Sequence, residues 1–412
     1  MDDLSRRPDS GPMPLTGLRV LDVSIWVQGP LGAMMLADLG ADVIKVEKPG
    51  VGDFARGAKT IFGRSQELPG GRALMFEIAN RNKRSVGIDL AHPRGREAFY
   101  RLVQKSDAFV TNLHPGSLEK FGIDRTALTS VNPHLIYAQA TGYGSAGPAA
   151  LDPCQDTTGM ARSGFMFNAP SPDGAPTYQV GTLSDVLSAT ILAFAVVTAL
   201  LNRERWGTAL GVMCSQLSAM MWLQYYSIAQ FANSGQAFVP HDRKNAANPL
   251  VNIYRCKDDK WIACGMFLSQ RFVWSEFCEV LGVPQLANDE RFEDDQGRNR
   301  YNRELILALD SAFAKQDRSY WEKVLRQKGY WISVVNNVED LINDPQVSAN
   351  NYLVRSANGL TTVRFPFNFS DLEIATPKDA PSFGQDTESV LTDVAGYSAE
   401  DIMDLKVAGA VW

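Results

Sequence analysis

The stretch that decides the fold is Leu18-Arg-Val-Leu-Asp-Val23, followed by residues 30–40 and by Ala41-Asp-Val-Ile-Lys-Val46. The first and last of these segments are short and apolar, which predicts two β-strands. The segment between them predicts a helix that ends at Gly40, because glycine readily adopts the left-handed conformation that closes helices. A strand, a helix and a second strand in this order predict two parallel strands in one sheet.

The same alternation continues along the chain. Further strands are expected at 85–90, 108–112 and 135–141, and a helix over about 93–103. Strands that alternate with helices form a parallel sheet wrapped by helices. The first 200 residues therefore predict a Rossmann-like, doubly wound α/β domain. Ligands of such sheets bind beyond the carboxyl ends of the strands.

The pattern changes after residue 207. Helices are expected within 207–230, then a hairpin that pairs 252–256 with 260–266, and then three helices, at 269–281, 302–314 and 319–328. A short strand at 361–367 and an amphipathic helix at 398–408 close the chain. We expect a flexible leader at 1–14, a large α/β domain over 15–224, a small α+β domain over 225–330 and a linker with a C-terminal part at 331–412.

Bulk properties limit the function. A chain of 412 residues fits about two domains, and a net charge of −6 argues against binding to a nucleic-acid backbone. The five cysteines are odd in number and lack CxxC spacing, so we expect reduced thiols in a cytoplasmic protein. The four histidines form no HExxH motif, so no metal site is predicted.

One carboxylate lies at the mouth of an apolar segment. Gly181-Thr-Leu-Ser-Asp185 leads directly into residues 186–201, about 16 residues that are too few to span a membrane and predict a core helix. The helix dipole would favour an ionised Asp185 near neutral pH. Asp185 is then either the N-cap of the helix, the commoner role, or a carboxylate nucleophile.

Two further sets of residues bear on ligand binding. Gly142-Tyr-Gly-Ser-Ala-Gly147 fits a dinucleotide motif, but Pro148 and Pro153 interrupt the helix that the motif needs, which favours a tight glycine turn. Five basic residues lie near predicted strand ends and are expected as solvated charges, whose shared location would form an electropositive rim suited to phosphates. They are Lys45, Lys48, Lys83, Arg84 and Lys120.

Four aromatic residues follow roughly helical spacing. They are Trp222, Tyr225, Tyr226 and Phe231. Core packing is the expected role of such residues, and the lining of an acyl pocket is the alternative.

A set of short motifs runs from Leu15 to the C-terminus. The motifs are Leu15-Thr-Gly-Leu-Arg-Val-Leu-Asp22 with Gly29-Pro30, Leu36-Ala-Asp-Leu-Gly-Ala-Asp-Val-Ile-Lys-Val-Glu47, Asn82-Lys-Arg-Ser85 with Asp89-Leu90, Asn112 with Pro115-Gly116 and Leu118, Asn132-Pro133 with Leu135-Ile-Tyr137, Gly142-Tyr-Gly144, Asp344-Pro-Gln346 and Gly396-Tyr-Ser398. Together they resemble the motifs of the class III CoA-transferases, a superfamily that also contains α-methylacyl-CoA racemases. The resemblance is specific for the superfamily, not for a substrate.

The resemblance implies an interlocked, ring-shaped homodimer in which the C-terminal segment returns to the large domain. It implies transfer of CoA from an acyl-CoA donor to a free carboxylic acid, with CoA as a substrate and no tightly bound cofactor. Asp185 stands where the family has its catalytic aspartate, so the resemblance favours the nucleophile over the N-cap. The reaction would pass through an anhydride and an aspartyl-CoA thioester on Asp185.

The resemblance also implies a set of CoA contacts. Lys48 and Lys120 among them replace arginines of relatives, which keeps the charge but loses bidentate geometry. The expected contacts are Val27, Gln28, Lys48, Ile88, Asp89, Asn112, Leu113, His114, Lys120, Ala140, Thr141, Gly142 and Tyr143.

Two departures from the family pattern matter. Gln155 stands in place of a histidine of the racemases, which removes one of the two acid/base groups that racemisation needs. The glycine-rich loop of formyl-CoA:oxalate transferases has no counterpart near 245–251, so an acid larger or more apolar than oxalate is expected. An acyl-CoA racemase or isomerase, and a subunit of a hetero-oligomeric transferase, remain as alternatives.

Overall fold

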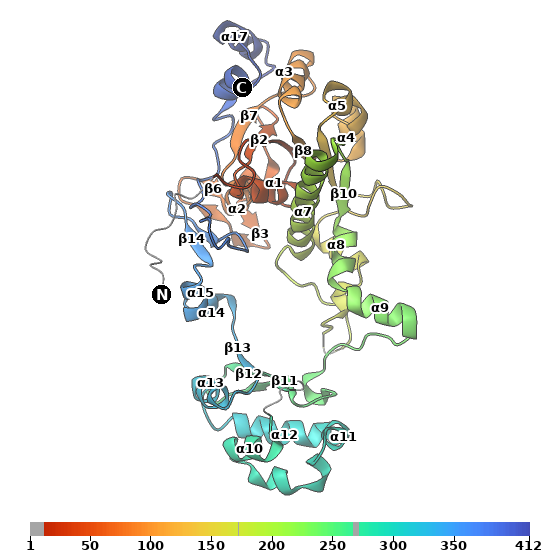
Figure 1. Cartoon of the computed structure of the whole chain (residues 1–412), viewed down its shortest axis with the longest axis vertical. Coiled ribbons are helices and arrows are strands. Elements are labelled where there is room, and N and C mark those ends of the chain that lie inside the picture. Colours follow the sequence, from red (N-terminus) through yellow and green to blue (C-terminus); the bar gives the residue numbers. More distant parts are fainter. Residues whose placement is uncertain (1–11, 172, 267–271) are drawn as a thin grey trace. The chain divides into compact units, whose positions relative to one another are not determined.

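The computed structural model describes residues 12–171, 173–266 and 272–412, and it forms two compact units. One unit comprises the chain up to Phe238 together with Tyr352–Trp412, and the other is Val239–Asn351 (Figure 1). Most of the leader predicted for 1–14, and the start of the helix predicted for 269–281, lie outside the described residues. Each unit has its own hydrophobic core.

A six-stranded parallel sheet forms the centre of the first unit. The predicted α/β architecture with a large parallel sheet is therefore confirmed, and the predicted strands are present with ends that differ by a few residues. The strands are β1 (Arg19–Val23), β2 (Asp42–Glu47), β7 (Arg84–Gly87), β8 (Ala108–Thr111), β9 (Ile136–Thr141) and β10 (Val212–Ser215).

The strand order is β10-β9-β8-β1-β2-β7. The chain builds outward from β1 to β2 and β7, and then returns to the other side of β1 to add β8, β9 and β10. The direction of building therefore reverses between β1 and β8, whose register pairs Val20 with Ala108 and Val23 with Thr111. The crevice beyond the carboxyl ends of two such strands is where open α/β sheets bind ligands.

Helices cover both faces of this sheet (Figure 1). On one face, α1 (Gln28–Asp38) and α7 (Leu183–Trp206) pack against strand residues such as Val20 and Val110. On the other face, Leu21 and Phe109 pack against a second group of helices. Successive side chains of a strand point to opposite faces, so strands buried on both faces are apolar throughout. The second group is α3 (Pro93–Gln104), α4 (Pro115–Phe121), α5 (Arg125–Val131), α16 (Thr387–Asp393) and α17 (Ala399–Val407).

The prediction of helices throughout 207–230 is wrong at its start. Helix α7 ends at Gly207, whose φ of 70° is left-handed, and Val212–Ser215 then forms the edge strand β10 beside β9. The helices α8 (Gln216–Leu223) and α9 (Tyr225–Ser234) follow. A strand of four residues at a sheet edge carries too short a pattern to be told from a helix.

Helix α7 is longer than the 16 residues expected. It has 24 residues, and its length and mean hydropathy of 2.0 would allow it to cross a membrane, although 44% of that segment is buried inside the molecule. Leu192 and Val196 are buried on the sheet side, while Phe194 is 73% exposed. The helix therefore presents one face to the core and one to solvent.

Shorter elements complete the first unit, and most of them contribute to loops beyond the strand ends. They are η1 (Phe54–Gly57), β3 (Thr60–Ile61), β4 (Arg64–Ser65), β5 (Glu67–Leu68), β6 (Arg72–Ala73), α2 (Leu74–Asn80), α6 (Asp156–Arg162), η2 (Phe165–Phe167), β14 (Leu353–Arg355) and β15 (Thr361–Val363).

The second unit is a three-stranded antiparallel sheet with helices. The predicted hairpin is present as β11 and β12, and β13 pairs with β12. In its core Tyr254 stacks on Phe313, and Trp321 contacts Phe313 edge to face. The elements are η3 (Arg243–Asn245), β11 (Val251–Arg255), β12 (Trp261–Gly265), α10 (Trp274–Val280), η5 (Pro284–Asn288), η6 (Glu290–Phe292), α11 (Asp295–Arg300), α12 (Asn302–Phe313), α13 (Arg318–Gln327), β13 (Ile332–Val335), α14 (Val338–Ile342) and α15 (Pro345–Ala349).

Candidate active site

A cavity of about 640 Å³ opens at the carboxyl ends of β1 and β8, where the strand order reverses. The loops that follow these strands are tied together by Asn112, whose Oδ1 accepts from the Ile25 N–H at 2.9 Å and whose Nδ2 donates to the Ile25 carbonyl at 2.8 Å. The cavity thus lies at the edge of the sheet where the sequence pattern predicts a ligand.

The cavity brings together nine of the predicted site residues from four separate segments of the chain. The Gln28 amide donates to the Thr141 carbonyl at 3.1 Å, which joins two of these segments directly. The nine residues are Val27, Gln28, Asn112, Leu113, His114, Ala140, Thr141, Gly142 and Asp185.

The other five predicted contacts do not line this cavity. Lys48 and Lys120 are exposed, and Ile88 is buried in a bridge with Val411. The Asp89 carboxylate accepts from the Ala91 N–H, and the Tyr143 ring lies 5.0 Å from the Arg162 guanidinium. The roles of Lys48, Ile88, Asp89, Lys120 and Tyr143 in CoA binding remain predictions.

Asp185 lies in the first turn of α7, not at its N-cap. The helix begins at Leu183, and Thr182 occupies the N-cap position with a left-handed φ of 55° and without a side-chain cap. The N-cap interpretation of Asp185 is therefore wrong. The side chain of Asp185 is instead directed into the cavity that it lines.

Asp156, the first residue of α6, satisfies the start of α7 in place of an N-cap. Its Oδ1 accepts from the Ser184 N–H at 2.8 Å and from the Asp185 N–H at 3.3 Å, and its Oδ2 accepts from the Tyr178 hydroxyl at 3.0 Å. The first N–H groups of a helix have no partner within the helix. A buried carboxylate from a neighbouring helix provides one here, and so fixes the backbone that carries Asp185.

Burial and the nearby charge of Asp156 raise the pKa of Asp185 to about 7, against a lowering by the hydrogen bond from Gln216. The expectation of a fully ionised Asp185 near neutral pH is thus corrected. A helix dipole contributes about 0.3–1 kcal/mol, whereas desolvation of a buried carboxylate is a larger effect of the opposite sign. Both protonation states are accessible at pH 7.

Gln216, the first residue of α8, contacts the carboxylate directly. Its Nε2 donates to Asp185 Oδ1 at 2.5 Å, and its Oε1 accepts from the Cys154 thiol at 2.7 Å. Gly159 allows this approach, because a Cβ at that position would lie 2.7 Å from Gln216 Oε1. The side chain of Gln216 is only 3% exposed.

The glycine motif at 142–147 bends after β9, and α6 begins only at Asp156, so no helix starts at the motif as a dinucleotide site would need. A Cβ on Gly142 would lie 2.1 Å from the Cβ of Cys154, which explains why glycine is required there. The Gly144 N–H donates to Thr141 Oγ1 at 3.1 Å. This N–H is therefore engaged within the turn.

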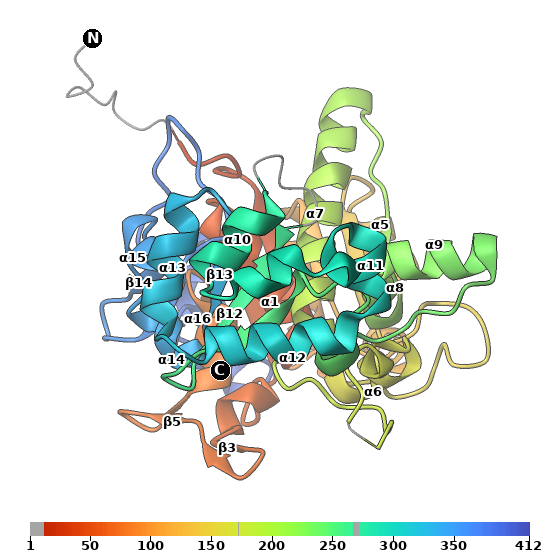
Figure 2. The same ribbon diagram turned by 90° about the horizontal axis from the view of Figure 1, so that it is seen from below.

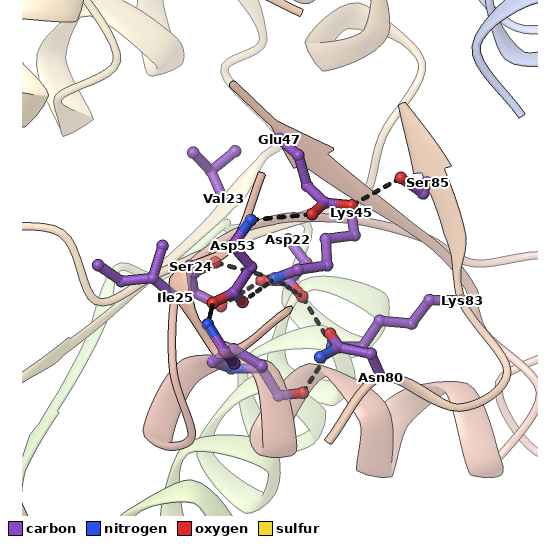
Figure 3. Close-up of polar contacts among 12 residues, drawn as sticks. Asp22, Val23, Ser24, Ile25, Lys45, Glu47, Asp53, Asn80, Lys83 and Ser85 are labelled. Atoms are coloured by element: carbon purple, nitrogen blue, oxygen red, sulfur yellow. Dashed lines mark hydrogen bonds and ion pairs between the residues drawn. The ribbon is translucent and has the colours of Figure 1, made fainter. Parts of the chain in front are cut away.

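Two of the five lysines and arginines expected at a phosphate-binding rim are buried instead, and Figure 3 shows the polar contacts around them. Lys45 Nζ lies 2.9 Å from Asp53 Oδ2, and Lys83 Nζ lies 2.8 Å from Asp22 Oδ2, with all four side chains fully buried. The pKa of Asp22 is raised by burial but lowered more by the two lysines, so it lies below its ordinary value. These groups form an internal ion network.

Arg84 likewise pairs with a carboxylate. Its guanidinium lies 2.5 Å from Asp42 Oδ2 on the neighbouring strand β2. The expected rim is therefore wrong for Lys45, Lys83 and Arg84, because pairing with strand carboxylates uses their charges.

The ion network contacts the backbone of the turn after β1, which forms part of the cavity wall. Lys45 Nζ donates to the Ser24 carbonyl at 2.9 Å, and Asp53 Oδ1 accepts from the Trp26 N–H at 3.0 Å. Trp26 has a left-handed φ of 65° and lines the cavity. Charges buried beneath this turn thus hold a strained backbone segment in place.

The aromatic residues at 222–231 neither pack in a core of this chain nor line the cavity. Trp222 and Tyr226 are 70% exposed, Tyr225 is 63% exposed and Phe231 is 58% exposed. Figure 2 shows α9 projecting outward from the end of α8. Both interpretations made from the sequence are therefore wrong for the single chain. The aromatic residues of the cavity are Trp26, Phe62 and Tyr178.

The roles of Asp156, Cys154, Tyr178 and Gln216 at this site were not predicted. Their partners lie up to 62 residues away along the chain, so no local pattern marks them. A polar residue that immediately follows a short apolar strand, as Gln216 follows β10, is the one available signal. The sequence pattern predicts a helix at β10, so it gives no strand end at which Gln216 would stand out.

No group of three or more His, Cys, Asp and Glu side chains that could hold a metal ion occurs among residues 12–171, 173–266 and 272–412. The five cysteines are free thiols.

Comparison with known proteins gives one family. Residues 15–387 match CoA-transferase family III. Acetyl-CoA:oxalate CoA-transferase of Acetobacter aceti is 31% identical over 344 residues, which cover 83% of this chain and 86% of that protein. Succinyl-CoA:glutarate CoA-transferase of Mus musculus is 28% identical, over 97% of this chain and 90% of that protein. The crystal structure of Rv3272 from Mycobacterium tuberculosis superimposes with a TM-score of 0.80 at 30% identity, over 92% of this chain and 99% of that one.

Proposed function

The chain belongs to CoA-transferase family III, and we propose that it moves CoA from an acyl-CoA donor to a free carboxylic acid with Asp185 as the nucleophile. One observation carries this proposal. The carboxylate of Asp185 lies in the same cavity as eight residues that the family pattern assigns to CoA. A partly desolvated carboxylate next to a bound thioester is positioned for attack on its carbonyl carbon.

The proposed reaction has four steps. Asp185 attacks the donor acyl carbon, so a C–O bond forms, the C–S bond breaks and CoA leaves as a thiolate. The thiolate attacks Cγ of Asp185 in the resulting anhydride and releases the donor acid as its carboxylate. The acceptor carboxylate then attacks Cγ of the aspartyl-CoA thioester and expels the thiolate again. Attack of this thiolate on the acceptor acyl carbon gives the new acyl-CoA and frees Asp185.

Each step exchanges one acyl derivative for another, so the balance needs neither a metal ion nor ATP. The protein must hold the thiolate close and keep water from the anhydride. Gln28 and Asn112 fix the two loops that enclose the cavity, through bonds to the Thr141 carbonyl and the Ile25 backbone. A rigid wall of this kind suits both tasks.

The acceptor acid is proposed by class alone, as a free carboxylic acid. Residues 222–231 are exposed and do not line the cavity, so they give no reason to expect an acid more apolar than oxalate. The relatives are named for oxalate and for glutarate. Gln155 lines the cavity in place of the racemase histidine, which favours transfer over racemisation.

We also propose a homodimer. Helix α9 buries none of its ten residues within this chain, and the adjoining faces of α7 and α8 expose Phe194 and Trp222. Exposed apolar patches of this kind mark interaction sites. A molecular mass in solution of twice the 45.3 kDa of the chain would support the proposal, and the monomer mass would contradict it.

The first experiment is Asp185→Ala in a screen of acyl-CoA donors against carboxylic acids, read by mass spectrometry. Wild-type protein should form a new acyl-CoA. When it is quenched during turnover it should carry CoA on Asp185, and when hydroxylamine is added during turnover it should carry a hydroxamate there. The variant should form neither, while circular dichroism shows an intact fold. Transfer at the wild-type rate by the variant would refute the mechanism.

A further inference from the structure

We propose that Gln216 is a catalytic residue of this transfer reaction, because its side-chain amide holds Oδ1 of Asp185 and would stabilise the oxyanion that forms on this atom. The inference rests on the proposed function of Asp185. It adds a group from the start of α8 to a site otherwise assigned to the loops after β1, β8 and β9 and to α7. The contact that carries it is the 2.5 Å hydrogen bond from Gln216 Nε2 to Asp185 Oδ1.

The orientation of the Gln216 amide is fixed by its second contact. The thiol of Cys154 is a donor, and the carbonyl oxygen Oε1 of Gln216 accepts from it at 2.7 Å. Nε2 must therefore face the carboxylate. In its ionised form the carboxylate of Asp185 requires a donor at the same point, so both contacts assign the amide in the same way.

The backbone around Gln216 is equally constrained. Ser215 caps α8 through its hydroxyl, which accepts from the Ser218 N–H at 2.9 Å, and the Leu217 N–H donates to the Gly142 carbonyl at 3.0 Å. Gly159 lies against the side chain, where any larger residue would displace it. A donor held by packing in this way needs no reorganisation during the reaction.

The chemistry explains why this donor would matter in the middle of the reaction. Gln216 engages Oδ1, which leaves Oδ2 to attack the donor thioester. In the second and third steps a nucleophile adds to Cγ of Asp185, and the electron pair of the remaining C=O bond moves onto Oδ1. The donor at Oδ1 then faces a growing negative charge, and its hydrogen bond strengthens in the transition state. The pair returns when the leaving group departs.

A second glutamine of the same region, Gln224, has contacts that are typical of a structural role. Gln224, at the other end of α8, donates from Nε2 to two backbone carbonyls, those of Ser163 and Met220. Gln216 instead has its two contacts with side chains of the cavity wall. Gln224→Met is therefore the matched control for Gln216→Met, since both variants replace a glutamine amide with a methionine side chain of similar size.

The test compares Gln216→Met with this control in steady-state and single-turnover transfer. Removal of one oxyanion donor lowers kcat about 100-fold or more, and we expect this for Gln216→Met with little change in the KM of the acyl-CoA donor. Rapid-quench mass spectrometry should show slower formation and slower decay of the CoA adduct on Asp185. The acid limb of the pH profile should also move to higher pH, because the amide lowers the pKa of Asp185. Gln224→Met should keep the wild-type kcat and pH profile.

Gln216→Asn is a second variant. It keeps an amide but shortens the side chain by one methylene, which moves the amide away from Asp185. The CoA adduct on Asp185 should again form and decay more slowly than in the wild type. Wild-type kcat, adduct kinetics and pH profile in either folded variant would overturn the role of Gln216 while leaving Asp185 as nucleophile. Loss of activity in Gln224→Met to the same extent would also overturn it, by indicating a packing effect. Transfer by Asp185→Ala would instead show that the proposed function itself fails.

Discussion

At the scale of single residues, Asp185 and Asp156 divide two tasks between two nearby carboxylates. Asp156 is buried, and its oxygens accept hydrogen bonds from backbone N–H groups and hydroxyls around the start of α7. Asp185 faces the cavity and keeps one oxygen for chemistry. Burial, and to a smaller extent the charge of Asp156, raise the pKa of Asp185, which would make it a stronger nucleophile once it is ionised.

The pH dependence of transfer follows from this arrangement. Attack requires the ionised carboxylate of Asp185, whose pKa is raised to about 7. We therefore expect kcat/KM for the acyl-CoA donor to rise about tenfold per pH unit below this value and to level off above it. Initial rates between pH 5 and 9 measure the profile.

The control for this profile is binding of the acyl-CoA to Asp185→Asn over the same pH range, because phosphate groups of the substrate titrate near pH 6. Binding that is flat with pH would assign the acid limb to Asp185. Constant activity down to pH 5 would contradict the raised pKa.

At the scale of elements, α6 and α7 are joined by one carboxylate. The N-terminus of α7 has no side-chain cap of its own, and Thr182 enters it with a left-handed backbone. Asp156 of α6 provides the missing acceptor, so the position of Asp185, the proposed nucleophile, depends on contact between α6 and α7.

Two substitutions of Asp156 separate its charge from its hydrogen bonds. Asp156→Asn keeps an acceptor for the Ser184 N–H but removes the charge near Asp185, so the acid limb should move to lower pH. Asp156→Ala removes the acceptor as well, and an unsatisfied buried N–H should lower the free energy of unfolding by about 1–3 kcal/mol. Urea unfolding and the pH profile of kcat/KM measure the two effects.

An Asp156→Asn variant whose acid limb stays in place would show that the charge of Asp156 does not reach Asp185. An Asp156→Ala variant as stable as the wild type would show that water replaces the lost acceptor at the start of α7.

The elements themselves were mostly predictable from the sequence. Strands such as β1 and β9 are buried on both faces, so their apolar character survives in a local pattern. The strands β3 to β6 were not predicted, because two residues carry no periodicity, and β10 was not predicted, because its four residues lie between two helices. Gln216 was missed with β10, since its meaning depends on the sheet edge that positions it.

At the scale of the whole molecule, the reversal of strand order between β1 and β8 unites residues from distant parts of the chain. The position of Asp185 at this crevice could be predicted from the family pattern, whereas the partners of its carboxylate could not. Their contacts join positions that are 29 to 62 residues apart, and only the folded chain brings them together. Lys45 and Lys83 were predicted as solvated charges for the same reason, because their carboxylate partners lie in other segments of the chain.

The buried ion network gives the last prediction. Lys45 links β2 to the turn after β1 and to Asp53, and its side chain is fully buried. Removing one partner of a buried ion pair leaves the other charge uncompensated, which costs about 3–5 kcal/mol. Lys45→Met should therefore lower the free energy of unfolding by that amount, whereas Lys48→Met, at an exposed position three residues later, should change it by less than about 0.5 kcal/mol. If Lys48 binds a phosphate of CoA, its variant should instead raise the KM of the donor. Equal stability of the two variants in urea unfolding would contradict the buried ion network and favour the solvated position of Lys45 that the sequence predicts.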